Sequence, residues 1–189
     1  MTPQDEIRMI GWMVEYEEMV QEGLLATNPQ TILQITQAIK DCTGIVWLVG
    51  NGGSGALASH MATDLQLAGV RAQAFTDMTA ITTYGNDFGF ENCFLQGLRR
   101  VVGSGDIVVM ISTSGESENL IVVARYLRSF ESRWMNKVIT LTGKGGGRLA
   151  GIGDINLIVP ANHTGAVQDI QQSILHMIAY WLMKDKETK

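Results

Sequence analysis

The stretch IVWLVGNGGSG at residues 45–55 decides how this chain folds, and IVVMISTSGES at residues 107–117 repeats its design. Each is an apolar, largely β-branched run that ends in a loop of glycine, hydroxyl and other small polar residues. A strand buried on both faces of a parallel sheet has this continuous apolar character. A Gly- and Ser-rich loop at its end lets backbone N–H groups and hydroxyls converge on an anion where the next helix begins. The two stretches therefore predict one phosphorylated small molecule held between two loops.

The length and charge of the chain limit the kinds of protein it can be. With 189 residues, it can bury the core of one domain but not of two ordinary enzyme domains, so we expect a single domain over 1–189. The net charge of −5, with no basic cluster denser than Arg99-Arg100, argues against nucleic acid or an anionic membrane as a partner. No basic start with an apolar signal core and no span-length apolar run is present, so we expect a cytoplasmic protein. Cys42 and Cys93 have no metal-type spacing and are expected to be reduced thiols that pack in the interior.

Helix and strand signals alternate along most of the chain. Two helices, over 5–25 and from Pro29 to Cys42, occupy the N-terminal residues 1–42. Residues 45–184 should hold the sheet and its covering helices: strands at 45–50, 71–76, 106–111, 137–142 and 155–159, helices at 54–68, 91–102, 118–130 and 165–184, and a helical turn at 78–84. This alternation predicts an α/β three-layer sandwich around a five-stranded parallel sheet. In a flavodoxin-like 2-1-3-4-5 order, the two loops would face each other across the crevice where ligands bind.

Several polar residues near this crevice are suited to chemistry. His60 and Asp64 are four residues apart on one helix and so share a face. Gln168 and His176 are eight apart on the last helix, about 12 Å along it and about 80° around it, so they can flank one ligand only at full reach. The segment 84–90 reads as a turn by composition, and 143–149 reads as a flexible loop.

At this point the chain resembles a known family, the phosphoheptose isomerases of the sugar-isomerase (SIS) fold. The resemblance runs from about residue 30 to residue 184. It rests, in order, on GNGGS at 50–54, HxAxDL at 60–65, GNDFGF at 85–90, ISTSGxS at 111–117, ITLTG at 139–143, and QDI at 168–170 with His176.

The resemblance implies roles for individual residues, in a protein that isomerises a phosphorylated sugar, most specifically sedoheptulose 7-phosphate. Asp64 and His176 fall on the family's base and acid positions. Its metal-ligand positions, usually occupied by zinc, are His60, Asp64, Gln168 and His176. The sugar site would be lined by Asn51, Gly52, Gly53, Ser54, Asn86, Asp87 and Gln168. The phosphate would be held by Ser112, Thr113, Ser114 and Ser117.

The residue types fit the reaction independently of the resemblance. Interconverting a ketose and an aldose moves a proton between adjacent carbons through an enediol, which requires a carboxylate base, an acid at the oxygens, and preferably a Lewis acid.

Three departures from the family leave the choice of sugar open. Position 64 is Asp where the best-known members have Glu, the stretch 66–69 lacks an Arg that they carry, and Glu116 and Glu118 put acids beside the proposed phosphate.

Two other interpretations of the function remain. Gly50-x-Gly52-x-x-Gly55 with Asp77 also satisfies a nicotinamide dinucleotide fingerprint. A non-catalytic SIS module that binds a phosphosugar or a protein is a second alternative. The presence of His60, Asp64, Gln168 and His176 argues against it, because a pure binding module would not need these residues.

The Met- and Ile-rich stripe on residues 7–24 needs apolar cover. We expect a homotetramer that uses this helix as an interface, with burial within the chain as the rival.

Overall fold

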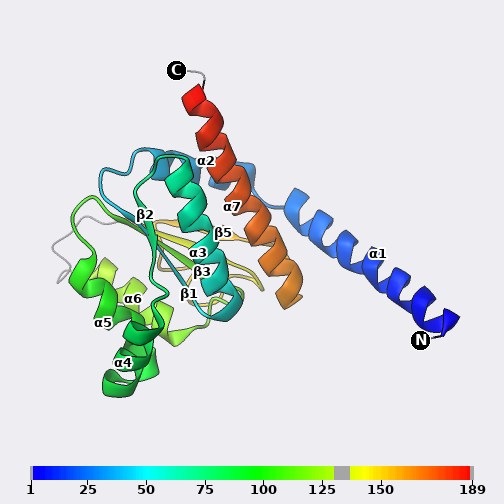
Figure 1. The fold of residues 1–189 in the computed structure, drawn as a ribbon, viewed down its shortest axis with the longest axis horizontal. Coiled ribbons are helices and arrows are strands. Elements are labelled where there is room, and N and C mark those ends of the chain that lie inside the picture. Colours follow the sequence, from blue (N-terminus) through cyan, green and yellow to red (C-terminus); the bar gives the residue numbers. More distant parts are fainter. Residues whose placement is uncertain (1, 130–136, 188–189) are drawn as a thin grey trace.

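The computed structural model describes residues 2–129 and 137–187, and it is one five-stranded sheet covered by helices (Figure 1). The elements are α1 (Pro3–Leu25), α2 (Pro29–Lys40), β1 (Val46–Gly50), α3 (Gly52–Leu67), β2 (Ala72–Ala74), α4 (Met78–Phe88), the 3-10 helix η1 (Phe90–Asn92), α5 (Cys93–Val101), β3 (Ile107–Ser112), α6 (Glu118–Arg128), β4 (Lys137–Thr142), β5 (Ile155–Ile158) and α7 (Thr164–Glu187). All neighbouring strands pair in parallel, in the order β2-β1-β3-β4-β5. The predicted 2-1-3-4-5 order is therefore confirmed.

Alternate residues of each strand feed two separate cores, one on each face of the sheet. On β1, Val46 and Leu48 pack with apolar residues of α2, α3 and α7. Trp47 and Val49 point to the other face and pack with those of α5 and α6. This explains why the strand sequence is apolar without interruption. The three-layer sandwich is thus confirmed, with α3 and α7 together in one helical layer.

Asp106 holds the amino ends of the two central strands in place. Its carboxylate accepts hydrogen bonds from the backbone N–H of Ile45 (2.7 Å), the indole N–H of Trp47 (2.9 Å) and the backbone N–H of Gly103 (2.8 Å). The side chain is buried, so these charge-assisted bonds form away from water. They help to set the register in which Gly50 pairs with Ile111, which brings the two ligand loops to the same edge.

The helix α1 extends away from the body, and only its C-terminal half packs on α7 (Figure 1). The Tyr16 hydroxyl donates to Asp169 Oδ2 at 2.6 Å, and this hydrogen bond raises the pKa of Tyr16 to about 12. In the N-terminal half the apolar side chains Ile7, Ile10 and Met13 are more than half exposed. Within the described chain, then, the apolar stripe is only partly covered.

Three expectations about local structure need correction. The segment 84–90 is not a turn, because α4 continues to Phe88 and ends only at Gly89, whose φ is +84°. Asp77 begins this helix by accepting a hydrogen bond from the backbone N–H of Ala80 (2.7 Å), a cap that composition did not reveal. The strand expected at 71–76 is shorter, Ala72–Ala74. The expected helix 118–130 ends at Arg128 in the structure, and its residue 130 lies outside the described residues.

The two cysteines are free, as expected. Cys93 is fully buried, and burial raises the pKa of its thiol. Among the described helices, none combines the length and the apolar character that crossing a membrane requires.

Candidate active site

The two predicted ligand loops lie next to each other because β1 and β3 are adjacent. A reciprocal amide pair joins them: Asn51 Nδ2 donates to Asn119 Oδ1, and Asn119 Nδ2 donates to Asn51 Oδ1, both at 2.9 Å. Asn119 is 3% exposed and lies in the first turn of α6. Sequence reasoning missed Asn119, and only its place two residues after Ser117 could have suggested it. The pair fixes the first loop against the helix that follows the second.

The second loop has the features of an anion cradle. The hydroxyl of Ser112 accepts from the backbone N–H of Gly115 (3.0 Å), and that of Ser114 accepts from the N–H of Glu116 (3.2 Å). Ser117 is the N-cap residue of α6, and its side chain makes no capping bond. A hydroxyl that accepts a hydrogen bond still has its own O–H to donate. These side chains can therefore donate to a phosphate above the N-terminus of α6.

The acids beside this cradle are neutralised by a residue that sequence reasoning overlooked. Arg148 Nε contacts Glu116 Oε2 at 2.6 Å, and Arg148 NH2 contacts Glu118 Oε2 at 2.9 Å. The hydrogen bonds from Arg148 lower the pKa of Glu116. Because both carboxylates are bonded to the guanidinium, their repulsion of a phosphate is reduced.

The segment 143–149 is held to the phosphate loop by its backbone. The N–H of Gly143 donates to the carbonyl of Thr113 (3.2 Å), and the N–H of Leu149 donates to the carbonyl of Gly115 (2.9 Å). These hydrogen bonds place the segment that we expected to be a flexible loop beside residues 113–115. It lies alongside the loop that carries Ser112 and Ser114.

The residues expected at the sugar occupy different environments. Gly53 lies against the Gln168 amide, since a Cβ at position 53 would come within 2.5 Å of Gln168 Nε2. Ser54 is 4% exposed, which makes it less accessible than the loop glycines. Asn86 and Asp87 are exposed on the last turn of α4, where Asn86 Nδ2 donates to Asp87 Oδ1 at 3.0 Å. The structure thus brings Gln168 to the first loop but does not show contact of the 86–87 pair with it.

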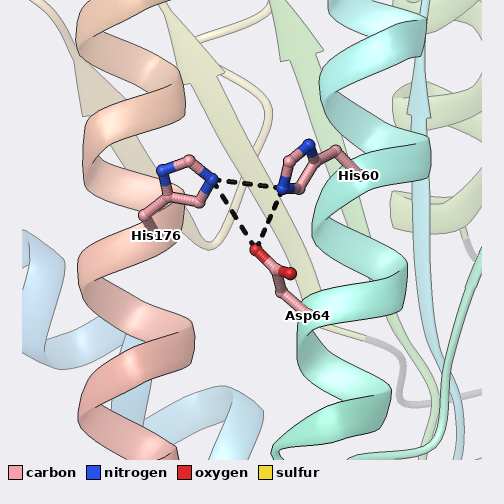
Figure 2. A group of neighbouring side chains, drawn as sticks. All are labelled: His60, Asp64 and His176. Atoms are coloured by element: carbon pink, nitrogen blue, oxygen red, sulfur yellow. Dashed lines mark hydrogen bonds and ion pairs between the residues drawn. The ribbon is translucent and has the colours of Figure 1, made fainter.

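Three side chains from α3 and α7 converge on one point (Figure 2). His60 Nε2 lies 3.4 Å and His176 Nε2 lies 3.7 Å from Asp64 Oδ2. The two imidazole nitrogens are 3.2 Å apart. Asp64 reaches the level of His60 because side chains on a helix lean toward its N-terminus. The predicted pairing of Asp64 with His60 and His176 is therefore present in the structure.

The carboxylate of Asp64 is the best-shielded member of this group. The residue is 9% exposed, and its Oδ2 is buried without a hydrogen bond, although both imidazoles lie within ion-pair distance. A buried carboxylate oxygen that makes no hydrogen bond is costly unless a positively charged group lies near it. An imidazolium, a metal ion or a proton taken from a substrate would each satisfy this oxygen.

The same three atoms fit a tetrahedral metal ion. Zinc bound at 2.0–2.1 Å by four ligands separates adjacent ligand atoms by about 3.3 Å. The observed separations of 3.2, 3.4 and 3.7 Å are close to this value, and imidazole with carboxylate is a donor set that zinc accepts. The amide of Gln168 lies beside Gly53. The amide beside His176 belongs to Gln172, whose Nε2 lies 2.7 Å from His176 Nε2.

The path of the two helices sets which residues of α3 and α7 face each other. α3 and α7 run side by side in the same direction, so that Gly53 faces Gln168 and His60 faces His176. These pairs are separated by seven residues on α3 and eight on α7, or about 10.5 and 12 Å of helix. Gln168 therefore belongs to the level of the first loop, and His176 to the level of Asp64.

The structure argues against the interpretation that this chain binds a nicotinamide dinucleotide, because the acidic residue expected to bind the ribose has another role. Asp77, the candidate for a ribose hydroxyl, uses its carboxylate to cap α4. The glycines at 50, 52 and 55 are explained by the loop and by the close approach of the chain to itself. A Cβ on Gly50 would come within 2.7 Å of the Ser54 backbone.

Comparison with known proteins shows the family to which the chain is similar. The SIS domain family model matches residues 15–143. The phosphoheptose isomerase of Helicobacter hepaticus is 36% identical over 170 residues, which cover 80% of this chain and 84% of that protein. That of an Enterobacter species is 38% identical over 149 residues, covering 75% and 76%.

Solved structures give the same result over nearly the whole chain. The phosphoheptose isomerase GmhA from Neisseria gonorrhoeae superimposes with a TM-score of 0.83 at 30% identity, covering 94% of this chain and 98% of that one. A phosphoheptose isomerase from Francisella tularensis gives a TM-score of 0.84 at 31% identity, covering 97% and 100%. With two adjacent ligand loops, an anion cradle and a buried carboxylate between two histidines, this chain belongs to the phosphoheptose isomerase family of SIS domain proteins.

Proposed function

We propose that this protein interconverts the ketose and aldose forms of a seven-carbon sugar phosphate, with sedoheptulose 7-phosphate as the ketose. The observation that carries this proposal is the buried carboxylate of Asp64 between His60 and His176. A phosphosugar isomerase needs a shielded base at the reacting carbons and an anion site for the phosphate. Membership of the family, together with the hydroxyl-lined loop at 112–117, supports the second requirement.

Asp64 is the proposed base and His176 the proposed acid. The carboxylate removes the proton from the hydroxyl-bearing carbon next to the carbonyl, and the electron pair moves to form the enediol as the carbonyl oxygen is protonated. His176 supplies that proton and takes one from the neighbouring hydroxyl. Asp64 then returns its proton to the former carbonyl carbon. The net change is a shift of the carbonyl by one carbon, with no oxidant or reductant consumed.

We further propose that His60, Asp64 and His176, with Gln168 as the fourth expected ligand, hold a divalent metal ion, with zinc as the best fit to the donor set. When bound, such an ion would stabilise negative charge on the sugar oxygens as a Lewis acid. His60 then contributes by orienting the group, since its imidazole also contacts Asp64 and His176. The exposure of His60 and His176, whose side chains are 54% and 40% accessible, leaves this group open to a ligand.

The phosphate is proposed to lie at the N-terminus of α6, bound by Ser112, Thr113, Ser114 and Ser117. The sugar would extend from there past Asn51, Gly52, Gly53 and Gln168 toward Asp64. Ser54, Asn86 and Asp87 remain candidates for the sugar hydroxyls. Asn51 precedes α3 and is hydrogen-bonded to Asn119 of α6, and Gly53 beside Gln168 comes next along the chain toward Asp64, which supports this direction.

Replacing Ser114 by Ala is expected to weaken binding of a phosphosugar roughly 10- to 100-fold, because a hydrogen bond to a charged group is worth about 1.5–3 kcal/mol. Binding of the same sugar without its phosphate should change little. Isothermal titration of both sugars measures this difference. Ser104→Ala is the matched control, since Ser104 is exposed and precedes β3 at the opposite edge of the sheet. Equal losses for both sugars would reject the phosphate site.

We also propose that the protein is a homotetramer in which α1 forms the interface. The exposed residues Ile7, Ile10 and Met13 support this, because they continue the apolar stripe beyond the portion of α1 that packs on α7. Light scattering at micromolar concentration should give about four times the mass of one chain. Ile10→Glu should lower that mass, whereas Glu15→Gln, at an exposed polar position of the same helix, should not. A monomer in the unmodified protein would refute the proposal.

The direct test of function is a turnover assay with sedoheptulose 7-phosphate beside shorter ketose phosphates, with metal analysis of the same sample. We expect the seven-carbon substrate to give the highest kcat/KM. A shorter ketose phosphate with a higher kcat/KM would keep the reaction but change the substrate. Turnover of none of them, with binding retained, would favour the non-catalytic phosphosugar-binding module.

A further inference from the structure

Lys144 adopts a backbone conformation that usually belongs to glycine. Its φ is +49°, and among the residues that the structure describes it is the one non-glycine residue with a positive φ. The residues around it, Gly143 and Gly145 to Gly147, are all glycines, so glycine at position 144 would relieve this strain at once. Strained backbone of this kind clusters at functional sites, which makes the long charged side chain of Lys144 a candidate for a role.

Hydrogen bonds hold the backbone around Lys144 at the carboxyl edge of the sheet. The N–H of Gly143, which directly follows β4, donates to the carbonyl of Thr113 at 3.2 Å, and the N–H of Lys144 donates to the carbonyl of Ala161 at 3.0 Å. A Cβ at position 143 would come within 2.6 Å of the Val167 side chain of α7. Lys144 therefore lies where the loop at 112–117 meets the start of α7.

The ammonium of Lys144 is held at the first turn of α7. Its Nζ donates to Thr164 Oγ1 at 2.8 Å. Thr164 is four residues before Gln168, so the two side chains share a face of the helix and are about 6 Å apart along its axis. Gln168 lies against Gly53 of the first ligand loop. The ammonium is thus one helical turn from the level at which α7 meets that loop, and both Lys144 and Thr164 are exposed to a ligand.

The phosphate site lacks a positive charge of its own. The loop at 112–117 contains no Lys or Arg, and Arg148 binds two carboxylates, those of Glu116 and Glu118. The partner of Lys144 is a neutral hydroxyl, which does not offset the charge of the ammonium. An ammonium has three N–H groups, so two of them can still donate to an anion.

We propose that Lys144 is the cationic residue of the phosphate site and donates from its ammonium to the phosphate of the bound sugar. This inference rests on the proposed function, because it takes the phosphate to lie at the loop 112–117. Lysine binds a phosphate as a point charge on a flexible stem. The ammonium can therefore reach an anion above the loop while the backbone of Lys144 stays hydrogen-bonded to Ala161.

The experiment measures binding of sedoheptulose 7-phosphate and of unphosphorylated sedoheptulose to the full-length protein by isothermal titration calorimetry. Lys144→Met removes the charge but keeps an unbranched stem, so the backbone strain at this position is unchanged. We expect it to weaken binding of the phosphosugar at least about tenfold, the effect of one lost hydrogen bond to a charged group. Binding of the unphosphorylated sugar should change little, and Lys144→Arg should retain most of the phosphosugar affinity.

Lys137→Met is the matched control. Lys137 is exposed at the amino end of β4, the strand that Lys144 follows at its other end, so the variant loses the same charge at the opposite edge of the sheet. It should bind both sugars as the wild type does. Added salt should weaken phosphosugar binding in the wild type and in Lys137→Met more than in Lys144→Met, because salt screens an exposed charge.

Two results would overturn the proposal. One is a phosphosugar affinity in Lys144→Met equal to that of the wild type. The other is an equal loss for both sugars, since Lys144 would then support the sugar site as a whole and not the phosphate. Circular dichroism and melting curves show whether each variant is folded.

Failure of this inference can be told apart from failure of the proposed function. If the wild type binds and isomerises sedoheptulose 7-phosphate, but Lys144→Met binds it equally well, only the role of Lys144 is wrong. If the wild type binds the phosphosugar without isomerising it, the proposed reaction fails and the same titrations still decide the role of Lys144. If the wild type binds neither the phosphosugar nor inorganic phosphate, the phosphate site and the role of Lys144 are refuted together.

Discussion

Isomerase turnover should fall by about 10²-fold or more when Asp64 is replaced by Asn, while binding of the phosphosugar changes only a few fold. The amide has nearly the same shape as the carboxylate but cannot accept the proton from the sugar carbon. The proposed phosphate site is a different region of the protein, the loop at 112–117, so most of the binding energy should remain. A fall in kcat with little change in the substrate dissociation constant is the expected result.

The metal content of the Asp64 variants must be measured beside their activity, because Asp64 is also a proposed ligand. If Asp64→Asn keeps its metal and loses turnover, the loss belongs to the base. Asp64→Glu is the matched variant, since it keeps the carboxylate and restores the side-chain length usual in the family. It should retain or raise activity. Full activity in Asp64→Asn would refute the role of Asp64 as the base.

The fold could be predicted from sequence because its strands are buried on both faces. The runs at 45–49 and 107–111 are apolar at every position, and this excludes a half-exposed strand. The order of the sheet followed from the loops that leave β1 and β3, since ligand loops meet where the strand order reverses. The length of α4 did not follow, because Asn and Gly at 85–86 are typical of turns while the cap by Asp77 decided the local structure.

The site was predictable where side chains share a helix and less so where they meet across elements. His60 and Asp64 are four residues apart on α3, so their convergence follows from helical geometry. The contact of His176 with His60 and Asp64 depends on how α3 and α7 pack, which spacing alone does not give. The pairing of Arg148 with Glu116 joins residues 32 positions apart through two loops. No periodic pattern in the sequence marks such a contact.

Replacing Gly115 by Ala should disrupt the phosphate cradle and lower the free energy of unfolding by about 2 to 5 kcal/mol. Gly115 has a φ of +67°, a conformation that costs a residue with a side chain about 1–2 kcal/mol. In addition, a Cβ at this position would overlap the carbonyl oxygen of Gly146, a backbone atom that cannot rotate away. Relieving such a clash by moving backbone costs roughly a further 1–3 kcal/mol.

Gly145→Ala separates the two contributions. Gly145 has a φ of +81°, but nothing lies within 4 Å of a Cβ added there. Both variants therefore suffer the conformational strain, and only Gly115→Ala forces the 143–149 segment away from the loop that carries Ser112 and Ser114.

Gly145→Ala should lose about 1–2 kcal/mol of stability and keep its phosphosugar affinity. Gly115→Ala should lose more stability and at least about tenfold in affinity, the effect of one lost hydrogen bond to a charged group. Urea unfolding and titration with the phosphosugar measure both quantities. If the two variants bind the phosphosugar equally well, the contact between the 143–149 segment and the loop at 112–117 does not shape the anion site. The strain at a positive φ, which both variants share, would then account for the whole change in affinity.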